Sequence, residues 1–348
     1  MQLVKENKMA VHINHPRFTK KDKRKLGLLM IVVGLALIIG AFFLKRWEDR
    51  TYTMEGGTSA VELELANGKA GTFMYNGEEY VMRSDVDAYL IMGIDKDGPV
   101  KRGEDAWDGG QADMLQVLVV DHAAKTWQLL AIDRNTLVSF EVLNQDGTSA
   151  GMQFMQLCLA HGYSYGLEDG CMKTVKAVRD ILLNRKMTGY YALNMGGINE
   201  LNDLVGGVPI TVTEEFLEID PTLKVGETIT LTGDDAEKFV RARMNMEDDR
   251  NELRMARQEV YLDAFVQRFD ALSEDEILSI YDKMMDYVVT NMGSKTFADL
   301  ISVCKDYTKL DSIKIKGTAQ IENGFETFRM DDVDRIETGL KLFYERKA

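Results

Sequence analysis

The chain has 348 residues and a formal net charge of −14, from 42 lysines and arginines against 56 aspartates and glutamates. This length allows one large domain or two small ones, and the acidic balance argues against a nucleic acid as partner. The three cysteines cannot all pair with one another and lack metal-ligand spacing, so small buried hydrophobic side chains are expected at Cys158, Cys171 and Cys304.

Positive charge is concentrated at the N-terminal end. Residues 1–50 hold eleven basic and four acidic residues, a net of +7, so residues 51–348 carry −21.

Residues 26–44 carry no charge and would span about 28 Å as a helix. Most of the basic residues precede this run. The pattern predicts a single-pass protein of the cell membrane, with a cytoplasmic basic tail over residues 1–25 and a transmembrane signal anchor over residues 26–44. The rest of the chain is predicted to be extracytoplasmic. The competing interpretation is a cleaved signal peptide, but the run is long for one and no small-residue cleavage site follows it.

Residues 45–84 are predicted as a linker and β-hairpin region, with turns at Asn67-Gly68 and Asn76-Gly77. Further on, nearly continuous apolar runs indicate strands that are covered on both faces, and strands alternating with helices favour a layered α/β domain over residues 85–348. Strands are predicted over residues 88–94, 114–120, 126–132, 189–194, 208–213 and 312–317, the fifth at a sheet edge because of Pro209. Helices are predicted over residues 154–160, 167–183, 198–205, 234–243, 253–270, 275–290, 296–307 and 332–346.

Charged residues lie at the ends of the first three predicted strands. Asp95 ends the first, Asp113 opens the second after a glycine-rich loop, and Arg134 directly follows the third. Ligands of open α/β sheets bind beyond the carboxyl ends of strands. Two carboxylates beside a glycine-rich loop suit a hard cation such as Mg²⁺, although aspartates at loop ends are also common turn formers. Arg134 follows a buried strand, so it must find a partner or reach an opening.

Five arginines lie within residues 241–257, namely Arg241, Arg243, Arg250, Arg254 and Arg257. On a helix the last three share one face, and Gln258 lies directly above Arg254. Guanidinium groups bind phosphate oxygens bidentately, so this face fits one wall of an anion site. The alternative is a solvated helix whose arginines pair with the neighbouring acids. No nucleophile motif is present, and a packing or capping role is expected for His161.

Several of these residues belong to an ordered set of motifs: Gly93-Ile94-Asp95, Asp113-Met114, Arg134-x-Thr136, Leu204-Val205-Gly206-Gly207-Val208, Phe239-Val240-Arg241-x-Arg243 and Arg254-x-x-Arg257-Gln258. Together with the N-terminal apolar run, this set resembles the LytR-CpsA-Psr family over roughly residues 85–269. The resemblance implies a membrane-anchored three-layer α/β/α domain around a central mixed sheet. It also implies a phosphotransferase that moves a glycopolymer, of teichoic acid or polysaccharide type, from undecaprenyl pyrophosphate onto peptidoglycan.

The same resemblance implies roles for individual residues. Asp95 and Asp113 would hold Mg²⁺ against the pyrophosphate. Arg134, Arg241 and Arg243 would be the catalytic contacts to its oxygens, and the binding set would be completed by Arg254, Arg257 and Gln258. The apolar part of the domain between sheet and helices would hold the polyprenyl chain. The partners implied are a polyprenyl-pyrophosphate glycolipid, peptidoglycan and, through the N-terminal helix, the membrane.

The chain departs from the family pattern at several positions, including Asn251, where an acidic residue is usual. Gln111 replaces an arginine before the second strand, Gln156 replaces a common lysine, and Asn135 replaces an aspartate. Each missing cationic contact would weaken pyrophosphate binding by about 1.5–3 kcal/mol. Two alternatives therefore stay open. One is a non-catalytic scaffold or regulator that binds polyprenyl phosphate or wall polymer, and the other is a polyprenyl-pyrophosphate pyrophosphatase with water as acceptor.

Overall fold

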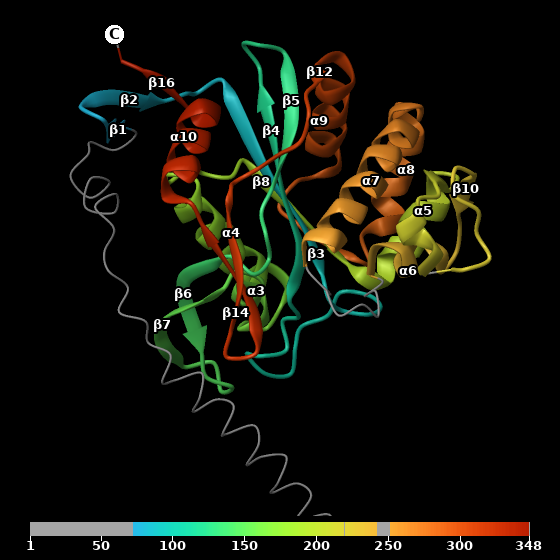
Figure 1. Cartoon of the computed structure of the whole chain (residues 1–348), viewed down its shortest axis with the longest axis horizontal. Coiled ribbons are helices and arrows are strands. Elements are labelled where there is room, and N and C mark those ends of the chain that lie inside the picture. Colours follow the sequence, from blue (N-terminus) through green and yellow to red (C-terminus); the bar gives the residue numbers. More distant parts are fainter. Residues whose placement is uncertain (1–71, 219, 242–250, 348) are drawn as a thin grey trace, which may run out of the picture. The chain divides into compact units, whose positions relative to one another are not determined.

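Figure 1 shows the computed structural model of the chain, which describes residues 72–218, 220–241 and 251–347. These residues belong to a unit that extends over residues 57–348. The predicted basic tail, the predicted transmembrane anchor and the predicted turn at Asn67-Gly68 lie outside the described residues. Within the described ranges, every helix is too short or too polar to cross a membrane.

The central sheet is mixed, as expected. Its strand order is β11-β8-β3-β4-β5-β12, and β13 also pairs with β5. β3 runs antiparallel to β4 and parallel to β8, and β4 runs antiparallel to β5. The strand bounds are β3 Val86–Ile94, β4 Ala112–Asp121, β5 Thr126–Ala131, β8 Gly189–Asn194, β11 Val288–Thr290, β12 Thr308–Lys309 and β13 Ile313–Lys314. Because β3 and β5 both run opposite to β4, their carboxyl ends lie at the end of the sheet where β4 begins.

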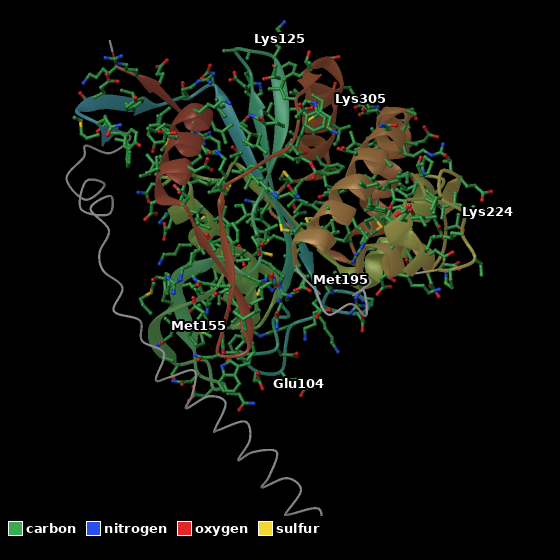
Figure 2. All side chains as sticks on the ribbon, viewed as in Figure 1. Glu104, Lys125, Met155, Met195, Lys224 and Lys305 are labelled. Atoms are coloured by element: carbon green, nitrogen blue, oxygen red, sulfur yellow. The ribbon has the colours of Figure 1, made fainter. Side chains whose placement is uncertain are left out.

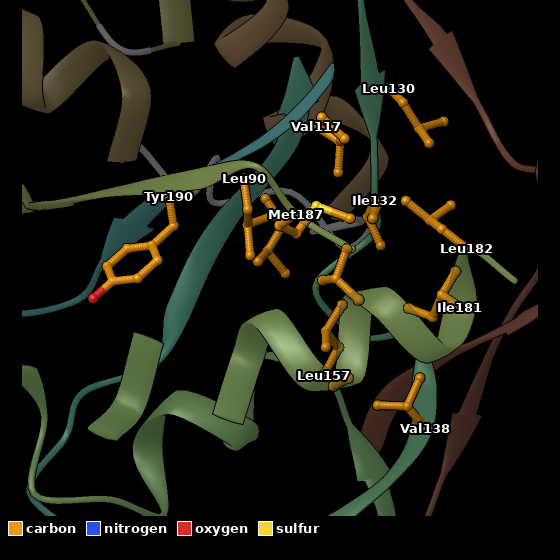
Figure 3. Close-up of a cluster of buried hydrophobic side chains, with 14 of the residues drawn as sticks. Leu90, Val117, Leu130, Ile132, Val138, Leu157, Ile181, Leu182, Met187 and Tyr190 are labelled. Atoms are coloured by element: carbon orange, nitrogen blue, oxygen red, sulfur yellow. The ribbon is translucent and has the colours of Figure 1, made fainter. Parts of the chain in front are cut away.

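Helices cover both faces of this sheet (Figure 1). One layer contains α3 (Cys158–Gly162), α4 (Leu167–Ile181) and α10 (Asp332–Phe343), and the other contains α7 (Asn251–Asp270), α8 (Glu274–Met284) and α9 (Ser294–Asp306). Successive residues of β4 explain the arrangement, since side chains alternate between the faces of a strand. Val117 packs in the cluster with Ile181 and Leu182, part of which Figure 3 shows, whereas Leu118 packs in the cluster with Leu300.

A further apolar cluster joins α7 and α8 to a smaller group of elements. This group comprises η1 (Met195–Gly197), α5 (Ile198–Leu204), β9 (Val208–Thr211), η2 (Glu214–Glu218), β10 (Thr228–Leu231) and α6 (Asp235–Arg241). β9 was predicted as an edge strand, and it pairs with β10 in a two-stranded sheet of its own. Pro209 is tolerated there because a two-stranded sheet leaves one side of β9 without a ladder partner.

Three hairpins lie around this framework. β1 (Thr72–Tyr75) and β2 (Glu78–Met82) are joined at Asn76-Gly77, whose φ angles of 50° and 79° confirm the predicted turn. β16 (Tyr344–Arg346) extends this hairpin by pairing with β2. The other two hairpins are β6 (Leu137–Leu143) with β7 (Ser149–Gln156), and β14 (Gly317–Glu322) with β15 (Phe325–Met330).

Four predicted elements were wrong or incomplete. The helix over residues 154–160 is the end of β7 followed by the short α3, because this segment pairs with β6. The helix over residues 275–290 ends at Met284, after which the β-branched run at Val288 forms β11 against β8. The last helix ends at Phe343, before β16. The strand over residues 312–317 is short, and a hairpin that was not predicted follows it.

Candidate functional site

The carboxyl ends of β3 and β5 bring charged side chains together at one end of the central sheet. The backbone N–H of Asp95 donates to the carbonyl of Gln111 at 2.8 Å, so β3 and β4 are still joined at this point. Between them the register shifts: Gly93 lies opposite Met114 and Ile94 lies opposite Ala112. Asp113 is therefore the extra residue of a β-bulge, a device that re-aims a side chain. Asp95 and Asp113 thus lie at the same end of the sheet, as predicted.

The glycine-rich loop between these aspartates fits tightly against α3 and the turn after it. A Cβ atom at Gly109 would lie 2.1 Å from the carbonyl oxygen of His161, so only glycine is accommodated there. His161 is buried, and its Nδ1 lies 3.0 Å from the carbonyl oxygen of Gly110. Burial lowers the pKa of His161, so the ring is neutral and Nδ1 donates to this carbonyl. This contact supports the expected packing role of His161. Across the same loop, Lys96 pairs with Asp108.

Arg134 lies at the centre of the candidate site. Its Nη2 is 3.2 Å from Oδ1 of Asp113 and 3.2 Å from Sγ of Cys158, and it also donates to Oε1 of Gln111. Although burial disfavours the charged guanidinium, its interactions with Cys158 and Asp113 prevail and raise the pKa of Arg134. The side chain is 13% exposed. The buried Arg134 is therefore paired with a carboxylate, as expected, and this carboxylate, Asp113, is one of the predicted metal ligands.

Arg241 connects the second arginine motif to the same place. It ends α6, and its Nη2 lies 3.1 Å from Oδ1 of Asp95. Its Nη1 contacts Oε1 of Glu237 at 2.6 Å and Oδ1 of Asp97 at 3.2 Å. The hydrogen bond with Glu237 is the main reason why the pKa of Arg241 is raised. Two motifs 146 residues apart in the sequence thus meet in one network of charges.

The remaining predicted residues fall into two groups. Arg257 and Gln258 are buried in α7, with Arg257 only 3% exposed, so the alternative of a solvated helix face is wrong for these two. Arg243, Arg250 and the side chain of Arg254 lie outside the described residues. The direct contacts of the site therefore join Asp95 with Arg241, and Asp113 with Arg134.

Sequence reasoning missed several residues near the site. Glu237 and Asp97 were not singled out, although Glu237 lies four residues before Arg241 and this spacing on a helix signals an ion pair. Glu326 was missed as well, since it lies in the hairpin β14–β15, where no motif was recognised. Asn135 Nδ2 donates to Oε2 of Glu326 at 3.1 Å. No local signal in the sequence points to a contact of this kind.

The donor set fits a hard divalent cation that shares its ligands with a phosphorylated substrate. Among the described residues there is no group of three or more His, Cys, Asp or Glu side chains that could hold a metal ion. Asp95 and Asp113 supply two carboxylates at one end of the sheet, and each carboxylate has lone pairs for more than one partner. Mg²⁺ is commonly bound by one or two carboxylates, with substrate phosphate oxygens and water as its other ligands.

The residues of the candidate site all lie at one end of the central sheet. Figure 2 labels Glu104, in the loop between Asp95 and Asp113, and Lys125, in the turn between β4 and β5, at opposite ends of the sheet. Two arginines and two carboxylates are brought together at the Glu104 end, and these are groups of the kinds that bind anions and cations. Such groups can neutralise charge on a phosphoryl group and hold it in place.

The model of the LytR_cpsA_psr family matches residues 58–341. A protein of Enterococcus faecalis named polyisoprenyl-teichoic acid–peptidoglycan teichoic acid transferase TagU is 27% identical over 332 residues, which cover 92% of this chain and 97% of the relative. A structure of TagV from B. subtilis has a TM-score of 0.57 at 23% identity, covering 75% of this chain and 97% of that chain. A structure of TagT with bound octaprenyl pyrophosphate lipid has a TM-score of 0.54 at 20% identity, covering 74% and 89%.

Proposed function

The chain belongs to the LytR-CpsA-Psr family, and on that premise we propose that it transfers a glycopolymer from a polyprenyl-pyrophosphate carrier onto peptidoglycan. The observation that carries the proposal is the meeting of Asp95, Asp113, Arg134 and Arg241 at one end of the central sheet. The name of the relative from E. faecalis supports this reaction class, and the lipid bound to TagT supports the donor. A polymer of teichoic acid or polysaccharide type fits the proposal.

The chemistry we propose is a displacement at phosphorus. A sugar hydroxyl of peptidoglycan attacks the phosphorus that bears the polymer and forms a new P–O bond. The bond between this phosphorus and the bridging oxygen of the pyrophosphate breaks, so polyprenyl phosphate leaves. The proton of the hydroxyl is released to solvent. Arg241 and Arg134 bind the pyrophosphate oxygens and stabilise the charge that develops on them. Asp95 and Asp113 are the residues that would hold Mg²⁺, which supplies further neutralisation of the pyrophosphate when bound. Arg243, Arg254, Arg257 and Gln258 stay predicted members of the binding set.

A membrane anchor is part of the proposal because the donor lipid resides in a membrane. Residues 26–44 form an uncharged run that is long enough to span the hydrocarbon core, and basic residues are concentrated before it. Such a charge difference places the N-terminal tail in the cytoplasm and the catalytic unit outside. We therefore propose a single-pass protein of the cell membrane with an extracytoplasmic active site.

One observation favours a second candidate, a member of the family that binds without catalysis. Gln111 and Gln156 carry no charge where the family pattern has cations, and Gln111 accepts a hydrogen bond from Arg134 rather than adding a positive group. Fewer cations around the pyrophosphate weaken both its binding and the stabilisation of the transition state. Such a protein would retain the glycolipid as a scaffold or regulator.

The test is a reconstitution with the full chain in detergent. It is incubated with a polyprenyl-pyrophosphate oligosaccharide, Mg²⁺ and peptidoglycan fragments, and the fragments are analysed by mass spectrometry. The matched variants are Asp113→Asn and Asp121→Asn, because the two aspartates lie at opposite ends of β4. A sugar-phosphate adduct on the fragments is expected, with its rate lowered about a hundredfold by Asp113→Asn and unchanged by Asp121→Asn. Loss of the product in EDTA would support the magnesium site.

The same experiment separates the alternatives. Tight retention of the glycolipid with no adduct would make the protein a binder and would contradict the transferase proposal. Release of sugar phosphate into water, without an adduct, would identify a pyrophosphatase. An adduct whose rate is equal in both variants would show that Asp113 takes no part in the reaction.

A further inference from the structure

Two departures from the family pattern converge on one residue of the C-terminal hairpin. The side-chain amide of Asn135 donates to Oε2 of Glu326 at 3.1 Å, and the side-chain amide of Gln156 donates to the backbone carbonyl of Glu326 at 2.8 Å. Asn135 is buried, so its amide needs this partner. The side chains of Asn135 and Gln156 therefore both bind Glu326 and hold the hairpin β14–β15 next to the segment that contains Arg134.

Backbone contacts join the same elements. The N–H of Phe328 donates to the carbonyl of Asn135 at 2.9 Å, and Thr136 forms a parallel bridge with Phe328. On the other side, the N–H of Leu157 donates to the carbonyl of Thr136 at 2.8 Å, and the N–H of Cys158 donates to the carbonyl of Arg134 at 3.0 Å. The segment Arg134–Thr136 is thus held between β15 and the start of α3.

This arrangement matters for the guanidinium of Arg134. Its backbone is fixed by the contacts described above, and its head group is directed at Asp113 and Gln111. A displacement of about 1 Å in a group that binds the reacting phosphate can reduce catalysis about a hundredfold. A hairpin that fixes this segment can therefore affect where the guanidinium of Arg134 lies.

We propose that the hairpin β14–β15 is a positioning element of the anion site and that Glu326 is its positioning residue, matched to an amide at position 135. The inference rests on the proposed function in one respect, namely that Arg134 binds pyrophosphate. It also explains Asn135 as a partner of Glu326. An aspartate at position 135 would place a second carboxylate about 3 Å from that of Glu326, and like charges at that distance repel.

The first test compares variants of the full chain in their affinity for inorganic pyrophosphate with Mg²⁺, by titration calorimetry. Glu326→Ala is expected to raise Kd about fivefold to tenfold, and Glu326→Gln to leave it near the wild-type value because its amide oxygen still accepts from Asn135. Glu322→Ala is the matched control: Glu322 lies in the same hairpin but pairs with Arg329, and its removal should leave Kd unchanged.

A charge swap adds a result that a merely structural role would not give. Asn135→Asp should raise Kd about tenfold or more through repulsion by Glu326, and the double variant Asn135→Asp with Glu326→Gln should recover most of the affinity. Rescue supports the match between the two positions. If the double variant binds as weakly as Asn135→Asp, while Glu326→Ala binds as well as wild type, the positioning role is overturned.

A second readout does not depend on pyrophosphate. Amide hydrogen exchange in the segment Arg134–Thr136 and at Phe328 should become faster in Glu326→Ala and stay unchanged in Glu322→Ala. A wild-type protein that does not bind pyrophosphate would overturn the proposed function, and the exchange rates would still decide the inference. Equal exchange rates in both variants and in wild type would overturn the proposed positioning role of the hairpin.

Discussion

The two ends of the central sheet use the same residue types to different effect. At the end opposite the candidate site, Arg83 lies between Asp85 and Asp121, with nitrogen–oxygen distances of 2.7 to 3.1 Å through all three of its guanidinium nitrogens. Hydrogen bonds from Arg83 lower the pKa values of both carboxyl groups. At the site end, Arg241 binds three carboxylates, but Asp97 is 84% exposed and Asp95 is 45% exposed.

The difference teaches how an arginine that stabilises the fold can be told apart from one that we propose binds a ligand. We call the network of Arg83 closed because its guanidinium is 18% exposed and Asp121 is 21% exposed, although Asp85 is 41% exposed, and such a network stabilises the fold. The network of Arg241 is open toward solvent, which leaves access for the phosphate that we propose binds there. Figure 2 shows both ends in one view, with Lys125 labelled at the closed end and Glu104 at the open end.

The largest expected effect separates the two arginines by function. Arg241→Ala should lower kcat/KM for polymer transfer by at least about a hundredfold, because the variant removes stabilisation of charge in the transition state. Its thermal unfolding should be nearly unchanged, since the side chain is 37% exposed. Turnover in the reconstituted assay and circular dichroism melting measure both. An unchanged turnover would contradict the assignment of Arg241 to the site.

The next effect is on stability at the closed end. Arg83→Ala leaves Asp121 without its cation, and loss of this partly buried pair should lower the free energy of unfolding by about 1–2 kcal/mol. Chemical denaturation of the two arginine variants measures the difference. At a temperature where both are folded, Arg83→Ala should keep the wild-type turnover. A loss of activity as large as that of Arg241→Ala would erase the contrast between the ends.

A pH effect on stability should arise at the site end. Burial lowers the pKa of His161 below its usual 6.5, so below that pH the unfolded chain binds more protons than the folded protein. Stability should be complete above about pH 6.5 and should fall as the pH drops toward the folded pKa, by up to about 1.4 kcal/mol per pH unit. Melting curves between pH 7.5 and 5 measure this loss.

The control for this prediction is His161→Asn, whose amide can still donate to the carbonyl of Gly110 and does not titrate. Its stability should vary less over the same pH range. The acids at the closed end do not interfere, because the ordinary pKa of Asp85 and Asp121 is 3.8 and their contribution is lost only at lower pH. Equal pH dependence in wild type and variant would show that His161 is not the cause.

The smallest expected effect concerns two glycines with positive φ angles. Gly110 and Gly77 have φ angles of 77° and 79°, so alanine at either position should cost about 1 kcal/mol of stability. A Cβ at Gly77 meets nothing within 4 Å, whereas at Gly110 it would lie 2.7 Å from Cγ of Lys96, 3.1 Å from Cγ2 of Ile94 and 3.2 Å from the carbonyl oxygen of Asp95. Gly110→Ala is therefore expected to melt at a lower temperature than Gly77→Ala, and only Gly110→Ala should bind Mg²⁺ and pyrophosphate more weakly. Calorimetric titration of both tests this difference.

The sequence predicted those features that local patterns determine. Apolar runs located β3, β4, β5 and β8, the Asn76-Gly77 turn located the first hairpin, and the order of motifs identified the family. Three strand ends also predicted that Asp95, Asp113 and Arg134 lie together, because the pairing of β3, β4 and β5 brings these ends to one place. The chemical roles of these residues stay predictions.

Features that depend on distant segments escaped the sequence. The segment before α3 has mixed periodicity, and its pairing with β6 decided that it is a strand. The contact between Asn135 and Glu326 spans 191 residues, and no local pattern marks either side chain as a partner of the other. Likewise, composition cannot distinguish the closed network of Arg83 from the open one of Arg241, since only the arrangement in space separates them.

The pairing of β16 with β2 has a practical consequence for handling the protein. Tyr344 lies opposite Met82 and Arg346 lies opposite Tyr80, so β16 covers the edge of β2 that does not pair with β1. Removing β16 would leave the backbone groups on that side of β2 without partners, and uncovered strand edges recruit other chains. Shortened versions of the protein that stop before Tyr344 should therefore self-associate, and their loss from solution would be a defect of the edge rather than of the active site.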